Sequence, residues 1–300
     1  MQFPPIDLSG QVAIVTGAGR GLGRCHALAL ARRGAKVVVS DLAPREGASS
    51  AEAVAQEIRQ AGGEAMAVHA SVMDEAQVGA MVAEVMAQWG RVDILINNAG
   101  FLRDKSFGKS TIEDFQAIVD VHLMGAVRCT KAVWDIMKAQ NRGRIVFTTS
   151  SSGLYGNFGQ TNYGAAKLAL VGLMQTLSIE GQKNDIRVNC LAPTAATAMT
   201  EGLMPEEVLA ALKPEAVSPA VVYLCGPDAP NRQIVLAGAG SFATANVTMT
   251  HGLHLGLGDD VADQLNNCRE ELADRAGEKV PQAGSEQGQQ EVGMAMAAQR

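Results

Sequence analysis

The residues best suited to chemistry begin with a tyrosine and a lysine one helical turn apart. Tyr163 and Lys167 are four positions apart in a stretch with helical character, so both side chains project from one face. A phenol with a pKa of about 10 is only about 0.1% ionised at pH 7, and a nearby positive charge makes it a better base. Lys167 would supply that charge, and Ser150, just after a predicted strand, would hold a substrate oxygen. The three residues predict proton transfer to or from an alcohol.

A glycine-rich loop lies between the first predicted strand and the first predicted helix. Glycines let backbone N–H groups approach a pyrophosphate, and the helix N-terminus adds partial positive charge. The alternative is a turn without a ligand, but the position directly after a strand favours the cofactor. Tyr163 and Lys167 alone would often be an ordinary helix face, and this loop makes catalysis the better interpretation. The predicted loop residues are Thr16, Gly17, Gly19, Arg20, Gly21, Leu22 and Gly23.

Asp41, about twenty residues beyond that loop, indicates which dinucleotide binds. A carboxylate at the end of the second strand can accept hydrogen bonds from the adenosine ribose, and it repels a 2′-phosphate. Arg20 is a contrary signal, because it could pair with a 2′-phosphate. The alternative for Asp41 is a plain turn residue. The sequence favours NAD over NADP.

Short β-branched runs alternate with longer Ala- and Leu-rich stretches from Val12 onward, as in βαβ units. We predict an α/β fold, namely a Rossmann-type doubly wound parallel sheet between two helix layers (α/β/α) with a C-terminal extension. The expected strands are 12–15, 36–40, 65–68, 92–96, 144–148, 186–191 and 233–236, and the expected helices are 25–33, 51–61, 75–89, 112–137 with an internal break, 162–180 and 219–224.

The composition changes after about Val247 to Gly, Gln, Glu and Ala without a strand pattern. We predict an NAD-binding domain over residues 1–247 and a helical extension over 248–300. A terminal helix with a partly mobile tail and an extension packed on the domain are both open at this point.

Composition and charge exclude several classes of function. With 25 Lys and Arg against 31 Asp and Glu, the net charge of -6 gives no reason to expect nucleic acid. Five scattered cysteines support neither a disulfide framework nor a CxxC metal site, and no carboxylate completes a site with His251 and His254. Residues 1–10 lack the character of a signal peptide, and no apolar run reaches about 18 residues. We expect a cytoplasmic protein without a metal or a membrane span.

The combined motifs resemble those of the short-chain dehydrogenases/reductases. They are Thr16–Gly23, Asn97–Gly100 (NNAG), Ser150, and Tyr163 with Lys167. Further segments, among them 101–107, 121–125, 153–160 and 212–215, are similar to the (3R)-hydroxyacyl-CoA dehydrogenase domains of the type 2 peroxisomal multifunctional enzymes. This likeness covers nearly the whole chain and favours a packed extension.

The resemblance implies a role for each matched residue. Ser150 would orient the substrate, Tyr163 would be the acid/base, and Lys167 would bind the nicotinamide ribose and lower the pKa of Tyr163. His122 stands where most members have the Asn of a proton relay. It could substitute through its backbone carbonyl and a water, or be a structural helix residue. Tyr155 is expected beside the substrate with Ser150 and Tyr163. The other residues expected at the cofactor are Asp41, Ser71, Val72, Asn98, Ala99, Gly100, Pro193, Ala195, Ala196, Thr197 and Ala198.

The first functional hypothesis is an NAD-dependent oxidoreductase that interconverts a (3R)-hydroxyacyl-CoA and a 3-ketoacyl-CoA. A 17β-hydroxysteroid dehydrogenase is the enzyme alternative, and a catalytically silent NAD-binding sensor or scaffold is the alternative of another class. Arg103 and Lys105 are the local basic residues expected to attract an anionic CoA. Family resemblance also implies a homodimer or homotetramer.

Overall fold

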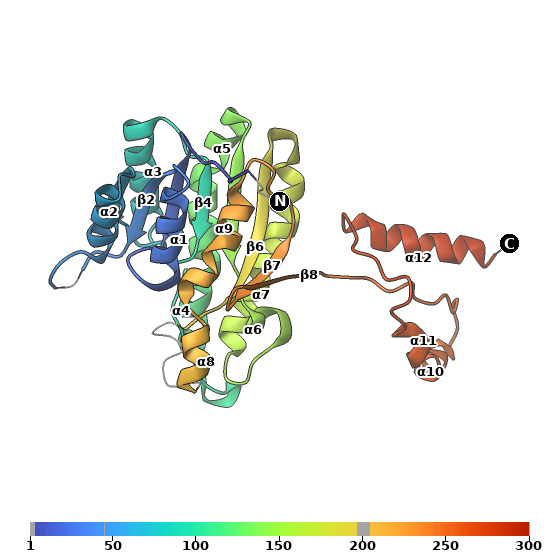
Figure 1. Cartoon of the computed structure of the whole chain (residues 1–300). Helices are drawn as coiled ribbons and strands as arrows, with labels where there is room; N and C mark the ends of the chain where they lie inside the picture. Colours follow the sequence, from blue (N-terminus) through green and yellow to red (C-terminus); the bar gives the residue numbers. More distant parts are fainter. Residues whose placement is uncertain (1–3, 45, 197–204, 300) are drawn as a thin grey trace. The chain divides into compact units, whose positions relative to one another are not determined.

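A central, mostly parallel sheet organises the chain in the computed structural model, which describes residues 4–44, 46–196 and 205–299. Its strands lie in the order β3-β2-β1-β4-β5-β6-β7-β8 (Figure 1). They are β1 (Val12–Thr16), β2 (Lys36–Asp41), β3 (Ala65–His69), β4 (Ile94–Asn97), β5 (Gly143–Thr148), β6 (Ile186–Thr194), β7 (Ile234–Gly238) and β8 (Ser241–Ala245). All pairings among β1 to β7 are parallel.

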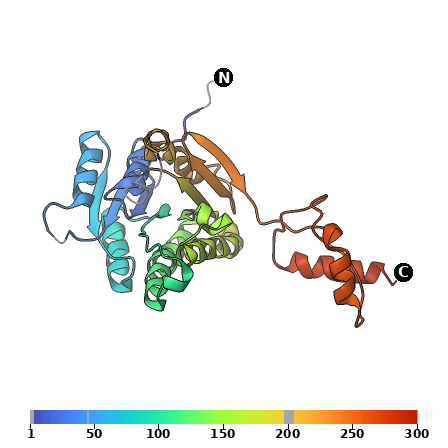
Figure 2. The ribbon, with the colours of Figure 1, turned by 90° about the horizontal axis from the view of Figure 1, so that it is seen from below.

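Helices cover both faces of the sheet, as Figure 2 shows. One layer holds α1 (Gly21–Ala31), α2 (Ser50–Gln60) and α9 (Ser218–Cys225), and the other holds α3 (Glu75–Trp89), α5 (Gly125–Gln140) and α7 (Thr161–Glu180). Every residue of β1, β4 and β5 is buried, which explains why apolar residues follow one another in these strands instead of alternating with polar ones. The predicted doubly wound α/β fold is confirmed.

One predicted helix is interrupted by a wider turn. Within 112–137 the chain forms α4 (Ile112–Val119), a π-helical turn at Asp120–Met124, and then α5. Arg128 holds this turn through Asp120, with Nη2 and Oδ1 2.7 Å apart. The expected internal break is therefore a π bulge, a feature often found near functional sites.

Three elements lie outside the predicted pattern. α6 (Ser151–Tyr155) and α8 (Glu206–Ala211) are too short to show helical periodicity. β8 follows β7 after Ala239 and Gly240, whose φ angles are both positive (50° and 74°). Such a two-residue turn joins antiparallel strands, so β8 ends the sheet as an antiparallel edge strand.

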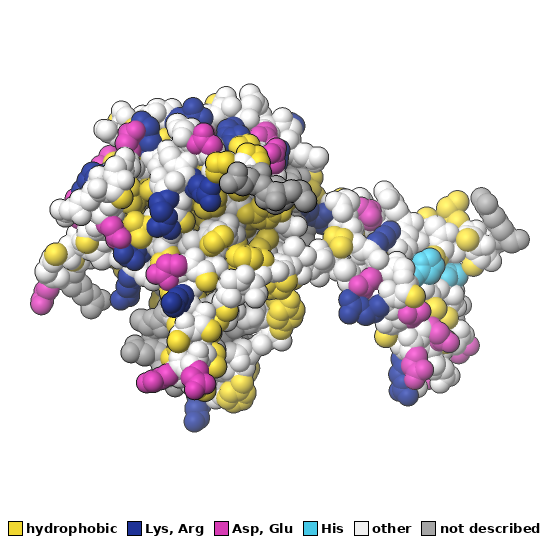
Figure 3. All heavy atoms as spheres, viewed as in Figure 1, with side chains coloured by type: hydrophobic (Ala, Val, Ile, Leu, Met, Phe, Trp, Pro, Cys, Tyr) yellow, Lys and Arg dark blue, Asp and Glu magenta, His cyan; other side chains and the backbone are white. Residues whose placement is uncertain are grey.

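The chain divides into two compact units, residues 1–244 and 245–300. The second unit holds α10 (Val261–Asn267), α11 (Arg269–Leu272) and α12 (Ser285–Ala297). Its described residues include no buried side chain, and Figure 3 shows hydrophobic side chains at its surface beside its histidines. These helices therefore form no apolar core of their own. The expected domain boundary and the expected packing of the extension stay predictions. No helix in the described ranges is long and apolar enough to span a membrane.

Arg144, near the amino end of β5, is fully buried and saturated with acceptors. Its guanidinium donates to the carbonyl oxygens of Gly143, Asp185, Gly226 and Pro227, and to the Asp185 carboxylate 3.0 Å away. Arg144→Met should destabilise the protein by about 3 kcal/mol, because it leaves these buried acceptors unpaired. Urea unfolding measures this loss. Arg59→Met removes an exposed ion pair with Glu52 and is the matched control. Equal stability of the two variants would contradict the prediction.

Candidate active site

The predicted chemical residues lie at the carboxyl edge of the parallel sheet. The strands are parallel, so their carboxyl ends lie side by side. At these ends Thr16 pairs with Ser40, Asn97 with Phe147, and Thr148 with Leu191. The chain order reverses between β1 and β4, the position where doubly wound sheets bind ligands.

Ser150, Tyr163 and Lys167 meet at this edge although they come from separate segments. Ser150 is the N-cap residue of α6, and its Oγ accepts the N–H of Ser152 at 3.2 Å. Tyr163 lies in the first turn of α7 and hydrogen-bonds to the Ser150 side chain. Lys167 Nζ is 5.5 Å from the Tyr163 ring centroid and donates to the Thr148 carbonyl at 2.6 Å. The geometry gives a serine hydroxyl and a phenol that can hold one oxygen between them.

The pKa of Tyr163 in the protein without a cofactor is not lowered as the sequence analysis expected. Burial raises the pKa of Tyr163 above its ordinary value of 10.0, and the charge of the Asp104 carboxylate raises it further. The hydrogen bond from Ser150 lowers this pKa, but by less than burial raises it. Burial also lowers the pKa of Lys167 to about 7, since the ammonium is desolvated. Lys167 therefore carries only part of a charge at neutral pH, and the expected lowering of the Tyr163 pKa is not present in the protein by itself.

His122 lies on the π turn and faces Tyr163. The two rings are edge to face with centroids 5.2 Å apart. Burial lowers the pKa of His122 to about 3, so its imidazole is neutral. Nε2 lies 2.7 Å from the Phe101 carbonyl, and Nδ1 has no partner among the described residues. A Cβ on Gly100 would lie 2.2 Å from the imidazole Cε1, so Gly100 is required for His122 to pack there.

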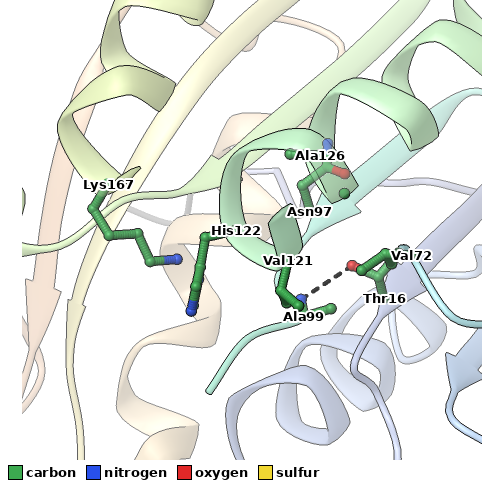
Figure 4. A pocket seen from close by; sticks show the side chains of 9 residues that line it. Thr16, Val72, Asn97, Ala99, Val121, His122, Ala126 and Lys167 are labelled. Atoms are coloured by element: carbon green, nitrogen blue, oxygen red, sulfur yellow. Dashed lines mark hydrogen bonds between the residues drawn. The ribbon is translucent and has the colours of Figure 1, made fainter. Parts of the chain in front are cut away.

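A small internal cavity lies between His122 and Lys167 and the ends of β1 and β4. Its volume of about 10 Å³ suits about one water molecule. Figure 4 shows His122 and Lys167 side by side on one side of it and Asn97 on the other. The cavity places a water-sized space beside His122 and Lys167. The relay role of His122 stays a prediction.

The glycine loop fits the pyrophosphate of a dinucleotide. Cβ atoms would clash at Gly23, 2.2 Å from the Gly17 carbonyl oxygen, and at Gly19, 2.3 Å from Ser50 Oγ. Gly17 and Gly21 have positive φ angles of 63° and 53°. In the described chain, α1 has no side-chain cap and no acidic residue in its first turn. Its N–H groups are thus available to an anion, as a phosphate site requires.

Hydrogen bonds of Asn98 and Thr16 connect the glycine loop to the segment that follows β4. Asn98 Nδ2 donates to the carbonyl oxygens of Thr16 and Gly17 at 3.0 and 3.2 Å. Thr16 Oγ1 accepts the N–H groups of Asn98 and Ala99 at 3.0 and 3.1 Å. Both amide hydrogens of Asn98 are therefore used within the protein, which leaves its Oδ1 as the atom that could meet a cofactor.

Asp41 stands at the end of β2, next to the loop. Its Oδ2 accepts the Gly19 N–H at 2.7 Å, and its Oδ1 accepts the Leu42 N–H at 2.8 Å. Arg20 is exposed at the start of α1. The Asp41 carboxylate lies against the loop. It would repel the 2′-phosphate of NADP, because like charges repel.

The remaining expected site residues are distributed along the same edge. The Ser71 N–H donates to the Gln77 side-chain oxygen, and Val72 packs where a Cβ on Gly125 would lie 2.7 Å away. Pro193, Ala195 and Ala196 follow or end β6. Tyr155 is 68% exposed at the end of α6. Thr197 and Ala198 lie outside the described residues.

The basic residues expected to attract CoA are not free. Lys105 Nζ lies 2.6 Å from Asp114 Oδ2, and Arg103 Nη1 lies 3.4 Å from Asp114 Oδ1. Asp114 is nearly buried as part of the capping box of α4. The three charges together leave a net charge of +1, so attraction of an anionic CoA by these residues stays a prediction. Lys105 and Arg103 lie nine and eleven residues before Asp114, and the sequence spacing alone does not show that these side chains pair.

Asp104 and Gln160 lie next to the expected site residues and were not predicted from the sequence. Gln160 lies three positions before Tyr163, and its Nε2 donates to Asp104 Oδ2 at 2.7 Å. The signal available in the sequence was a polar amide at the predicted start of the helix that carries Tyr163. No group of three metal-ligating side chains was found among the described residues.

Comparison with known proteins agrees with this geometry. The sequence matches the family model described as short chain dehydrogenase over residues 11–207. The peroxisomal multifunctional enzyme type 2 of Drosophila melanogaster is 49% identical over 240 residues, which cover 78% of this chain and 40% of that protein. The mouse protein of that name is 50% identical over 74% of this chain and 30% of its own length. This chain therefore spans less than half of these multifunctional relatives.

Two further matches cover nearly the whole of the matched protein, and one solved structure is matched over about half of its chain. A short-chain type dehydrogenase/reductase of Mycobacterium tuberculosis is 42% identical over 90% of this chain and 96% of that protein. Among solved structures, the full-length Drosophila enzyme has a TM-score of 0.79 and 39% identity, covering 94% of this chain and 49% of that chain. A short chain dehydrogenase from Mycobacterium avium has a TM-score of 0.78 and 34% identity, covering 92% and 99%.

Proposed function

This chain belongs to the short chain dehydrogenase family, and we propose that it oxidises a (3R)-hydroxyacyl-CoA to the 3-ketoacyl-CoA with NAD, or catalyses the reverse reaction. It is an oxidoreductase of the alcohol dehydrogenase type. The observation that carries the proposal is the meeting of Ser150, Tyr163 and Lys167 at the sheet edge where the glycine loop begins. Relatives named hydratase-dehydrogenase-epimerase support the acyl-CoA class.

The mechanism uses two hydroxyl groups and a buried amine. Ser150 Oγ and Tyr163 Oη bind the substrate oxygen, and Tyr163 as phenolate takes the alcohol proton while the C–H bond breaks. When bound, NAD supplies the ring that accepts the hydride and a positive charge near the phenol. Lys167 holds the same region positive when it is protonated. In the reverse direction, the Tyr163 phenol donates its proton to the ketone oxygen.

A substrate panel tests this proposal. NAD mixed with the protein and 3-hydroxyacyl-CoA esters should give absorbance at 340 nm with the (3R) form and none with the (3S) form. A signal with 17β-hydroxysteroids alone would replace the acyl-CoA assignment. Silence across the panel, with NAD binding intact by calorimetry, would favour a sensor or scaffold instead.

Asp41→Ala tests the choice of NAD. Removal of the carboxylate beside Gly19 should lower the ratio of kcat/KM for NAD over NADP by about tenfold or more, because repulsion of the 2′-phosphate is lost. Steady-state kinetics with both cofactors measure the ratio. Glu52→Ala, which removes an exposed carboxylate in the first turn of α2, is the control. An unchanged ratio in Asp41→Ala would contradict the assignment.

We further propose a homodimer or homotetramer in the cytoplasm. Apolar side chains remain exposed on α7 and on the π turn before α5, among them Met124, Leu168 and Ile179, and these suit a contact between copies. All five cysteines are free thiols, which supports a reducing compartment. A monomeric mass by light scattering would contradict the first proposal, and localisation of a tagged protein in cells tests the second.

A further inference from the structure

A hydrogen-bond network centred on Gln160 lies beside the proposed catalytic residues. Gln160 is only 9% exposed. Its Oε1 accepts Ser152 Oγ at 2.7 Å and Asn157 Nδ2 at 3.1 Å, and its Nε2 donates to Asp104 Oδ2 at 2.7 Å. The amide therefore uses both acceptor sites and one donor at once. A buried amide bonded in this way fixes the segments that it joins.

The network connects the two elements that carry the reactive hydroxyl groups. Ser152 lies in the first turn of α6, and its N–H donates to Ser150 Oγ. Gln160 is the N-cap residue of α7, three positions before Tyr163. Its side chain makes no capping bond and is free to bridge the two helices. Gln160 thus links the segment that carries Ser150 to the helix that carries Tyr163.

Two further bonds tie the Asp104 loop to the start of α7. The Lys105 N–H donates to the Gly159 carbonyl at 2.9 Å, and Asn162 Nδ2 donates to the Arg103 carbonyl at 3.3 Å. Asp104 is held between these bonds, so its carboxylate keeps a fixed place at the start of α7, bonded to Gln160 three positions before Tyr163.

Three groups from separate elements lie against the Tyr163 side chain: the Ser150 hydroxyl, the His122 ring and the Lys167 amine. The Asp104 carboxylate acts on it through its charge. The His122 ring is neutral because burial lowers its pKa to about 3. The Asp104 carboxylate raises the pKa of Tyr163, since a nearby negative charge disfavours a phenolate.

We propose that Gln160 and Asp104 are positioning residues: Gln160 fixes the spacing of Ser150 and Tyr163, and the Asp104 carboxylate, held by Gln160, places a fixed negative charge at the start of the helix that carries Tyr163. This inference rests on the proposed role of Tyr163 as the acid/base group. This negative charge acts in the same direction as burial and favours the protonated phenol, the state that donates a proton when a ketone is reduced.

Charge changes of opposite sign test the inference. In Asp104→Asn the side-chain oxygen still accepts from Gln160, but the charge is gone. The rising limb of kcat/KM against pH for alcohol oxidation should move to lower pH by about half a unit. Gln160→Glu still accepts from Ser152 and Asn157 but cannot donate to Asp104. In this variant the rising limb of kcat/KM against pH should move to higher pH. The value of kcat should fall by about tenfold or more, because Ser150 and Tyr163 lose their correct spacing.

The double variant Asp104→Asn/Gln160→Glu separates the network from simple damage. The amide introduced at position 104 can donate to the carboxylate introduced at position 160. The bridge then forms again with the donor and acceptor exchanged, and kcat should recover to within about threefold of the wild-type value. Asp135→Asn, which removes an exposed carboxylate on α5, is the matched charge control and should leave the limb unmoved. Circular dichroism and the thermal shift given by NADH verify that each variant is folded.

Two outcomes are distinguishable. An unmoved limb in Asp104→Asn, or a double variant no better than Gln160→Glu, would overturn the inference while an inactive Tyr163→Phe upholds the proposed function. Activity retained in Tyr163→Phe would overturn the proposed function and the inference with it.

Discussion

Tyr163→Phe should lower kcat for the active substrate by about 10²- to 10⁴-fold, the range that a positioned acid or base contributes. The substitution removes one oxygen from a partly buried ring that packs edge to face against His122. The hydroxyl bonds to Ser150, so its loss removes both the proton carrier and one contact to the substrate oxygen. The ring itself remains, and folding should be retained. Steady-state kinetics measure kcat, and the thermal shift with NADH shows that the cofactor still binds.

Tyr223→Phe is the matched control for this experiment. Tyr223 lies on α9, and its hydroxyl bonds only to Gln233 among the described residues, at 3.2 Å. It should retain nearly full activity. A Tyr163→Phe enzyme that turned over within about threefold of the wild-type rate would show that another group moves the proton.

The parts of the site that are local in sequence could be predicted. The glycine loop follows directly after a strand, and Tyr163 and Lys167 share one helix, so their spacing alone brings them together. The parallel sheet then places the ends of β1, β4 and β5 at one edge, which brings Ser150 to Tyr163. The fold class follows from the same regular alternation of strands and helices.

The parts that depend on tertiary contacts could not be predicted. The bond between Asp104 and Gln160 joins side chains 56 residues apart, and nothing in either segment specifies the other. The pKa values of Tyr163 and Lys167 depend on burial, which a helical spacing does not reveal. β8 was missed because Ala239 is not a residue that commonly marks a turn with positive φ angles.

Lys167→Met should lower kcat by at least about 10²-fold and yet stabilise the protein at neutral pH. Lys167 is 3% exposed, and the protein gives its ammonium one carbonyl acceptor among the described residues, that of Thr148. Burial lowers its pKa from 10.5 to about 7. Between these values the unfolded chain binds more protons than the folded one, so stability rises as the pH rises from about 7 to about 10.5. Below about pH 7 the full cost of the buried charge is present.

The methionine variant removes this cost and also removes the bond to Thr148. A shift of this size corresponds to about 4 to 5 kcal/mol, and an unpaired buried carbonyl costs about 1 to 3 kcal/mol. At pH 7 the variant should therefore be more stable than the wild type by about 1 to 4 kcal/mol. Near pH 10.5 the wild-type lysine is neutral in the folded state and about half neutral in the unfolded chain, and the lost bond should make the variant the less stable one.

Urea unfolding of both proteins at pH 7 and at about pH 10.5 measures the reversal. Lys131→Met, a substitution at an exposed position of α5, should show no change of sign between the two pH values. Stability that falls equally at both pH values in Lys167→Met would mean that the lysine is accommodated without a desolvation cost. A reversal together with lost activity would mean that the fold accepts a destabilising buried amine at the position where the proposed chemistry needs a positive charge beside the phenol.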